Sequence, residues 1–150
     1  MPAFRFRLQV VLKIADQALK LAEQRLAEEL RKRTALMEEC YACQTRLQDA
    51  LQGKRRALIQ TPSELGKWQM YVQQCNKSLQ WAKQRLKEQE EVVEKARKIV
   101  VEAKREVEKL KRLKEKQWLA FLEEERRNEQ KVLDETGQVL YQRQINEVIF

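Results

Sequence analysis

The sequence contains no histidine and very few residues that interrupt a helix, with only three glycines and two prolines among its 150 residues. Aromatic residues are also scarce, at 7%. Without histidine the chain lacks the commonest general base and a common metal ligand. No apolar run approaches the roughly 20 residues of a membrane helix, and the N-terminus has no apolar run of signal-peptide length. We therefore expect a non-secreted chain dominated by helix.

Charge is abundant, because 36% of the residues are Asp, Glu, Lys or Arg, and the mean hydropathy is −0.74. Such a chain buries a narrow seam rather than a thick core, which is typical of long helices and coiled coils. The net charge of +8 is uneven, since two basic stretches at 1–33 and 91–120 precede an acidic stretch at 121–150. This balance favours either nucleic acid or an acidic protein surface as a partner.

One short segment punctuates the chain, at residues 60–64. Thr61 can cap a helix, Pro62 suits a first helical position, and Glu64 completes a Thr-x-x-Glu capping box. The sequence therefore predicts a single domain over residues 1–150, with a helix over about 4–59, a turn at about 60–62 and a second helix over about 62–141.

Apolar residues recur with heptad spacing in both predicted helices. In the second helix, thirteen of fourteen seam positions between Leu65 and Leu110 are apolar, and the exception is Gln89. The first helix has a comparable seam from Leu12 to Ala57, in which Glu29, Arg33 and Lys54 are polar. Both helices therefore present one apolar stripe that another helix can cover.

A fold at Thr61 places residue i opposite residue 122 minus i, and it pairs large seam residues with small ones. It sets Leu12 against Leu110, Ala50 against Val72, Arg33 against Gln89, and Lys54 against Trp68 in a cation–π contact. The prediction is an all-α fold, a long antiparallel two-helix coiled coil whose second helix extends beyond Lys114 as an unpaired C-terminal overhang.

The residues give no sign of catalysis. Cys40 and Cys43 have the Cys-x-x-Cys spacing of metal and redox sites, but both fall in the seam of a continuous helix, and no second pair completes a metal site. The odd number of cysteines, with Cys75 as the third, is typical of free thiols. We expect no enzyme activity, no cofactor and no metal.

Candidate binding residues fall into two groups. The first lies at the expected open end of the hairpin, where Phe4, Phe6, Trp118 and Phe121 converge and where Arg5, Arg7 and Lys13 add positive charge. The second is the pair Met70 and Trp81, three helical turns apart on the outward face of the second helix. The four rings can either close the hairpin at this end or dock a partner. We predict partner binding by residues of both groups: Phe4, Arg5, Phe6, Arg7, Lys13, Met70, Trp81 and Trp118. The seven basic residues between Lys104 and Lys116 are interleaved with acids, so we expect no nucleic acid partner.

The two ends of the chain carry a resemblance to a known family. Residues 4–12, Phe-Arg-Phe-Arg-Leu-Gln-Val-Val-Leu, resemble the Phe-x-Phe-x-Leu-x-x-(Leu/Val)-Leu opening of FliJ-type flagellar export proteins. Residues 125–135, which end in Lys-Val-Leu-Asp-Glu, resemble that family's C-terminal Glu-x-Lys-x-Leu-Asp-Glu region, and Tyr141 and Arg143 stand where a trailing aromatic residue and arginine are often found.

The resemblance implies a component of the bacterial flagellar type III export apparatus, similar to the central stalk of rotary ATPases. It implies binding to the hexameric export ATPase FliI, whose assembly and activity it promotes, contact with the export-gate protein FlhA, and for some members the handling of export chaperones. The implied location is cytoplasmic, at the inner face of the membrane. An injectisome stalk protein, a coiled-coil scaffold that self-assembles, and a nucleic-acid-binding helical arm are the alternatives.

Overall fold

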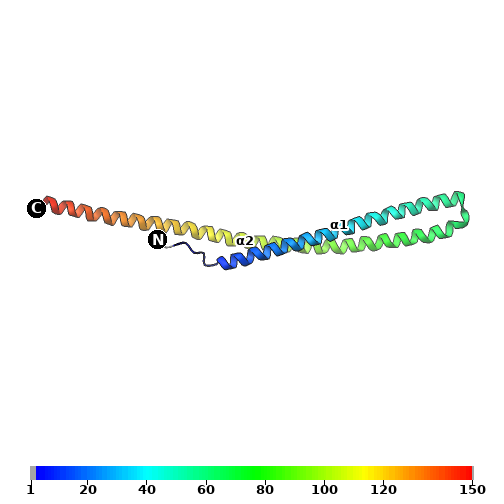
Figure 1. Ribbon diagram of the computed structural model, residues 1–150, viewed down its shortest axis with the longest axis horizontal. Coiled ribbons are helices and arrows are strands. Elements are labelled where there is room, and N and C mark those ends of the chain that lie inside the picture. Colours follow the sequence, from blue (N-terminus) through cyan, green and yellow to red (C-terminus); the bar gives the residue numbers. More distant parts are fainter. Residues whose placement is uncertain (1–2, 150) are drawn as a thin grey trace. The chain divides into compact units, whose positions relative to one another are not determined.

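The computed structural model describes residues 3–149, and every described residue from Gln9 onward is helical except Thr61 (Figure 1). The helix α1 spans Gln9–Gln60, a 3₁₀ turn spans Pro62–Glu64, and the helix α2 spans Leu65–Ile149. No strand occurs within this described range. The predicted all-α class is confirmed.

The helix bounds differ from the predicted ones at three points. The first helix begins at Gln9 rather than near residue 4, because the backbone N–H of Gln9 donates to the Phe6 carbonyl oxygen in a turn, at 3.1 Å. The second α-helix begins at Leu65 rather than Pro62 and continues past residue 141 to Ile149. Few breakers and no proline within α2 allow that length.

The turn between the helices does not use the predicted capping box. Thr61 makes no side-chain capping bond, and its carbonyl oxygen accepts the backbone N–H of Glu64 at 3.0 Å. The fixed φ of Pro62 instead starts a 3₁₀ turn that leads into Leu65. A backbone hydrogen bond between Glu64 and Thr61 therefore stabilises the turn in place of the predicted bonds from their side chains.

Contacts divide the structure into two units, each built from parts of both helices. Unit 1 combines the residues up to Asp16 with those from Arg105 onward, and unit 2 comprises Gln17–Lys104. The prediction of one domain over residues 1–150 therefore stays a prediction, and the two units are described separately.

In unit 2, α1 and α2 lie side by side and run in opposite directions from the turn (Figure 1). A buried cluster joins Ala50, Val72 and Cys75, with Leu47 packed against it. The predicted pairing sets Ala50 against Val72 and Leu47 against Cys75, so this cluster fits the register in which paired residue numbers sum to 122. Small residues at the seam, such as Ala57 and Ala82, are almost wholly buried and let the helices approach closely.

In the polar layer of the unit 2 seam, where the register sets Arg33 against Gln89, the two residues are not joined by a hydrogen bond. The Gln89 amide Nε2 instead donates to the carboxylate Oε2 of Glu29 at 2.6 Å and to the Glu29 carbonyl oxygen at 3.0 Å. Among the described side chains, Nε of Arg33 is buried without a hydrogen-bond partner. A carboxylate accepts from an amide donor, whereas a guanidinium carries only donors, so Gln89 can satisfy Glu29 through its NH₂ group.

The predicted cation–π contact between Lys54 and Trp68 is likewise not formed in the described structure. The indole ring of Trp68 lies across Gly53, the residue before Lys54, because a glycine has no side chain and leaves room for the ring. Its other neighbour is Tyr71, with ring centroids 6.1 Å apart in an edge arrangement. Shape therefore decides the position of this ring.

In unit 1, the buried residues Phe6, Leu12, Val107 and Leu110 form the interior. Beyond Phe121, every side chain up to Val148 is exposed except the partly buried Glu125. Apolar residues of this last segment, such as Leu133 and Leu140, lie on its surface. The C-terminal segment of α2 is therefore unpaired in the described structure.

Candidate partner-binding surfaces

Three aromatic rings converge in unit 1, as the sequence predicts. The Phe4 ring meets Trp118 edge to face with centroids 5.1 Å apart, and it lies 5.5 Å from Phe121. Trp118 and Phe121, one turn apart on α2, stack with centroids 5.8 Å apart. Aromatic pairs in such geometries contribute about 0.5–1.5 kcal/mol beyond their buried area. The cluster therefore anchors the extended residues before α1 to α2.

The four aromatic residues predicted to converge at this end have different environments. Phe6 is buried, so its ring serves the interior of unit 1 rather than a partner. Phe4 and Phe121 are half-buried, while Trp118 keeps 41% of its surface exposed. Trp118 is thus the ring of this cluster that a partner can reach most readily.

A shallow pocket of about 460 Å³ adjoins this cluster. Phe4, Leu12 and Trp118 line it, and the charged residues Lys111, Lys114 and Glu115 complete the lining. An apolar hollow with a few charged groups at its margin is suited to an apolar side chain that has a carboxylate neighbour. The sequence predicted that the rings converge, but it did not predict that Lys111 and Lys114 lie beside them.

The remaining predicted residues of this end, Arg5, Arg7 and Lys13, are exposed. Arg5 and Arg7 flank the buried Phe6 in the segment before α1, so alternation sends their side chains away from the interior. They add to the positive charge of unit 1, which also contains Lys111 and Lys114. This unit is therefore electrostatically suited to an acidic partner at its pocket.

Met70 and Trp81 lie on α2 in unit 2, with 65% and 73% of their surfaces exposed. Trp81 borders a hollow of about 420 Å³ whose lining includes Cys43 and the ion pair between Arg85 and Glu39. Met70 does not line it. Eleven residues of helix separate the two side chains by about 16 Å, so they offer two points along one face rather than one compact site.

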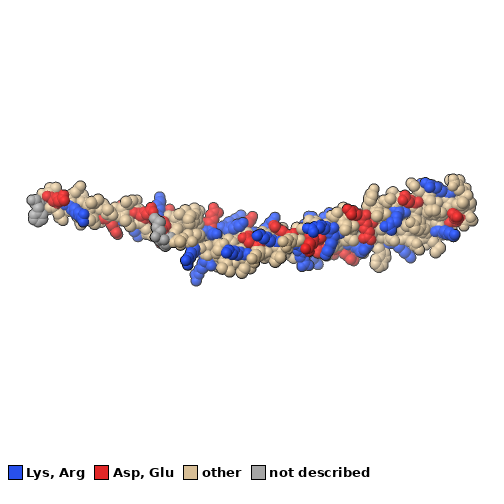
Figure 2. All heavy atoms as spheres, in the orientation of Figure 1, with Lys and Arg blue, Asp and Glu red and all other residues tan. Residues whose placement is uncertain are grey.

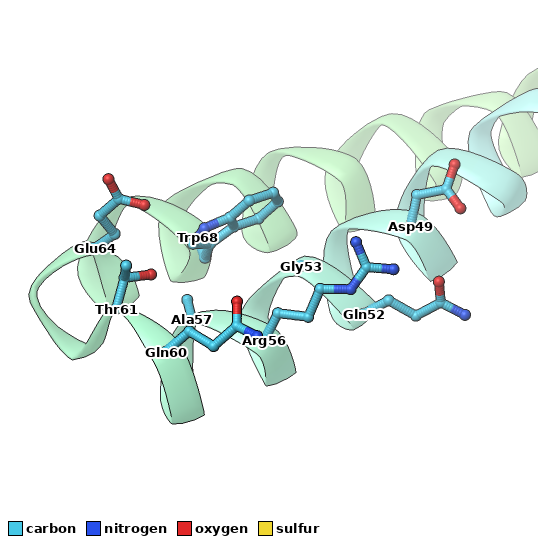
Figure 3. A pocket seen from close by; sticks show the side chains of 9 residues that line it. All are labelled: Asp49, Gln52, Gly53, Arg56, Ala57, Gln60, Thr61, Glu64 and Trp68. Atoms are coloured by element: carbon cyan, nitrogen blue, oxygen red, sulfur yellow. The ribbon is translucent and has the colours of Figure 1, made fainter.

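A further hollow near the turn was not anticipated from the sequence. It measures about 290 Å³ and lies between Trp68 of α2 and the side chains of Gln52 and Arg56 on α1 (Figure 3). Glu64 of the 3₁₀ turn closes one end of it. The signal was Gly53, whose place beside the seam leaves space for a large ring from the facing helix.

Among the described residues of unit 2, Glu29 is the only charged residue that is buried, and it is in contact with Gln89. The hydrogen bond from Gln89 lowers the pKa of the Glu29 carboxyl, burial opposes that shift, and the Lys32 ammonium 3.5 Å away lowers the pKa further. The carboxylate is therefore held ionised. This layer is structural and carries no reactive geometry.

The cysteines also serve the seam. Cys43 and Cys75 are buried, Cys40 is half-buried, and all three are free thiols. Burial raises the pKa of the Cys40 thiol, the neighbouring Cys43 and Glu39 add to the rise, and the positive charges of Lys83 and Arg85 oppose it. A thiol with a raised pKa is a poor nucleophile and metal ligand. Across residues 3–149, no three His, Cys, Asp or Glu side chains are placed to hold a metal ion.

Positive and negative side chains are interspersed over the face that Figure 2 shows. The basic stretch from Lys104 to Lys116 includes the ion pair between Arg112 and Glu108, with the nitrogen and oxygen atoms 3.9 Å apart. Interleaved charge of this kind does not form the continuous basic stripe that tracks a phosphate backbone. No helix in the described range has a stretch long and apolar enough to cross a membrane.

The structure is that of an all-α protein whose exposed apolar residues lie beside charged ones. The family model described as Flagellar FliJ protein matches residues 4–146, and the chain belongs to that family. It is accordingly a component of flagellar protein export, from a family of structural components of the export apparatus rather than of known enzymes. Comparisons with curated proteins and with solved structures give no match.

Proposed function

We propose that this chain acts as a stalk-like antiparallel coiled coil that binds the hexameric export ATPase FliI and promotes its assembly and activity. The observation that carries the proposal is the pocket of unit 1, where Phe4, Leu12 and Trp118 offer apolar surface beside Lys111 and Lys114. A ring-shaped ATPase that presents apolar side chains between carboxylates would complement it. Membership of the flagellar export family supports this choice of partner.

In this interaction we expect apolar residues to determine the affinity and charged residues to determine the rate of association. Burial of the Trp118 surface supplies affinity, at about 25 cal/mol per Å² of apolar area removed from water. The lysines and the exposed Arg5 and Arg7 steer association and make its rate depend on salt. We therefore expect aromatic and charged substitutions at this end to act on different kinetic constants.

The sharpest test is binding of the export ATPase to matched variants of this end. Trp118→Ala should raise the dissociation rate, because it removes apolar surface from the interface. Lys111→Glu with Lys114→Glu should lower the association rate and its salt dependence. Leu119→Ala, which changes an exposed residue beside Trp118 that does not line the pocket, is the matched control. Equal binding by all four proteins would refute the assignment of this surface.

A second contact, to the export-gate protein FlhA, is proposed for the outward face of unit 2 around Trp81 and Met70. The support is the exposure of a tryptophan beside a hollow that also holds charged groups, a combination that is enriched at protein interfaces. Through this contact the chain would couple the ATPase to the gate and lie at the inner face of the membrane without entering it.

Trp81→Ala should weaken binding to FlhA while leaving ATPase binding intact, because the substitution lies in the other unit. Tyr41→Ala, which removes an exposed aromatic residue of α1, is the control for a general loss of surface area. Unchanged FlhA binding by the Trp81 variant would remove this assignment and leave the ATPase proposal untouched.

A further inference from the structure

The end of α1 beside the turn combines exposed apolar residues with basic ones. Leu51, Leu58 and Ile59 are exposed, and Ile59 keeps 82% of its surface accessible, more than any other large hydrophobic residue of α1. Lys54 and Arg55 lie one helical turn before Leu58 and Ile59, so spacings of three and four residues place all five on the same side of α1. We call these five residues the tip surface.

The surroundings of the tip surface are basic. Residues 50–76 contain four basic side chains and one acidic side chain, a net charge of +3, whereas the whole chain has 31 basic and 23 acidic residues. The four basic residues are Lys54, Arg55, Arg56 and Lys67, and the acidic one is Glu64. Within residues 3–149, none of these four forms an ion pair. The positive charge of this end is therefore not neutralised inside the chain.

The nearest acidic residues lie away from the tip surface, around the hollow near the turn. Asp49 and Glu64 line that hollow together with Arg56, whereas none of the five residues of the tip surface lines it (Figure 3). The next charged residues along α1 and α2 are the basic Arg46 and Lys77. The tip surface therefore presents apolar and cationic groups without a carboxylate among them.

Protruding apolar side chains with basic neighbours have the chemistry of an interfacial membrane contact. In such contacts, apolar side chains enter the boundary between headgroups and acyl chains, and basic side chains contact anionic headgroups. A protein interface requires a partner of matching shape. A bilayer instead accepts side chains that stand out singly, as Ile59 does at the end of its helix. The exposure and the charge of the tip surface together favour lipid over an acidic protein.

From these observations we infer that the tip surface binds the surface of an anionic phospholipid bilayer. Leu58 and Ile59 enter the boundary between headgroups and acyl chains, while Lys54 and Arg55 contact the lipid phosphates. Apolar insertion and charge both contribute to the affinity, so the loss of either should weaken binding. This contact goes beyond the proposed binding to the ATPase and the gate, and it depends on neither of them.

The test is flotation of the full chain with vesicles of equimolar phosphatidylglycerol and phosphatidylcholine, compared with vesicles of phosphatidylcholine alone. The wild-type chain should bind the anionic vesicles only, and added salt should weaken binding. Leu58→Ser with Ile59→Ser should lower the affinity roughly tenfold, because no apolar group is left to insert at the end of the helix. Lys54→Gln with Arg55→Gln should lower it roughly tenfold as well, because two cations are lost from the contact.

Controls of equal chemistry are essential, because a chain with a net charge of +8 is attracted to anionic vesicles at many places. Leu21→Ser with Ile99→Ser removes two exposed apolar residues of unit 2 that lie far from the turn along the helices. Lys95→Gln with Arg97→Gln removes two exposed basic residues of the same unit. Both controls should bind like the wild-type chain, and circular dichroism checks that every variant stays helical.

Three results would overturn the inference. The first is a wild-type chain that does not float with anionic vesicles, which would leave an acidic protein as the occupant of the tip surface. The second is unchanged binding after the two serine substitutions at Leu58 and Ile59. The third is an equal loss of affinity in the tip variants and in their controls, which would assign the binding to net charge alone. Because the vesicles contain only lipid, none of these results bears on the proposed ATPase and gate contacts.

Discussion

At the scale of single residues, Gly53 determines where the largest side chain near the turn can lie. A Cβ at this position would overlap the Trp68 ring, whereas a Cβ at Gly137 would meet nothing within 4 Å. Helix propensity favours alanine at both positions by about 1 kcal/mol. The two glycines therefore provide a matched pair in which only the neighbourhood differs.

We predict that Gly53→Ala lowers the free energy of unfolding by about 1–2 kcal/mol, because the cost of displacing the Trp68 ring exceeds the gain in helix propensity. Gly137→Ala should be neutral or stabilising by up to about 1 kcal/mol. Urea denaturation followed by circular dichroism measures both. A stabilised Gly53→Ala variant would show that the ring does not occupy the space above this glycine.

A second residue-scale prediction concerns acid. The pKa of Glu29 in the folded chain lies below its ordinary value of 4.5, chiefly because Gln89 donates to the carboxylate. The stabilisation is present above the unfolded pKa and disappears as the pH falls through the lower folded pKa. Gln89→Leu should therefore be less stable than the parent near neutral pH, and the difference should shrink on acidification below 4.5. Denaturation curves at several pH values measure this, and a difference that grows in acid would contradict it.

At the scale of the helices, the heptad pattern predicts the seam because burial of an apolar stripe dominates helix pairing. Leu12, Ala50, Val72 and Leu110 are all buried where the pattern places them. The rings at Phe4 and Trp118 could likewise be predicted to converge, since the pairing register brings their segments together.

Other features could not be predicted because they depend on local geometry rather than on period. Whether Thr61 caps through its side chain depends on backbone angles that the sequence does not determine. The choice of Gln89 between Arg33 and Glu29 depends on which side chain presents an acceptor at the right height. Arg33 and Glu29 are about one helical turn apart, and a heptad register does not distinguish between two such neighbours.

The unpaired end of α2 leads to a prediction about helix stability. From Leu122 to Val148 nearly every side chain is exposed, so this segment gains little from tertiary packing, which supplies most of the stability of helices in proteins. Hydrogen exchange should be faster for amides of residues 125–148 than for those of residues 70–100. Equal protection in the two segments would mean that the tail has a partner even in the single chain.

At the scale of the molecule, the charge favours one class of partner, and the exposed apolar surface is confined to a few places. The protein is basic with interspersed acids, which favours solubility and an acidic protein partner over nucleic acid. The apolar surface remains local, at the Trp118 pocket and at Trp81. Membership of the flagellar export family identifies the apparatus in which these surfaces would act.

The most direct test of the proposed function is ATP hydrolysis by the export ATPase with and without this protein, alongside microscopy of ring formation. The wild-type chain should increase the rate and the fraction of complete hexamers. A Phe4→Ala, Trp118→Ala variant should lose most of that effect, while Val132→Ala should retain it. Hydrolysis and ring formation that do not change when the wild-type chain is added would contradict the claim that this protein acts as the stalk of the ATPase.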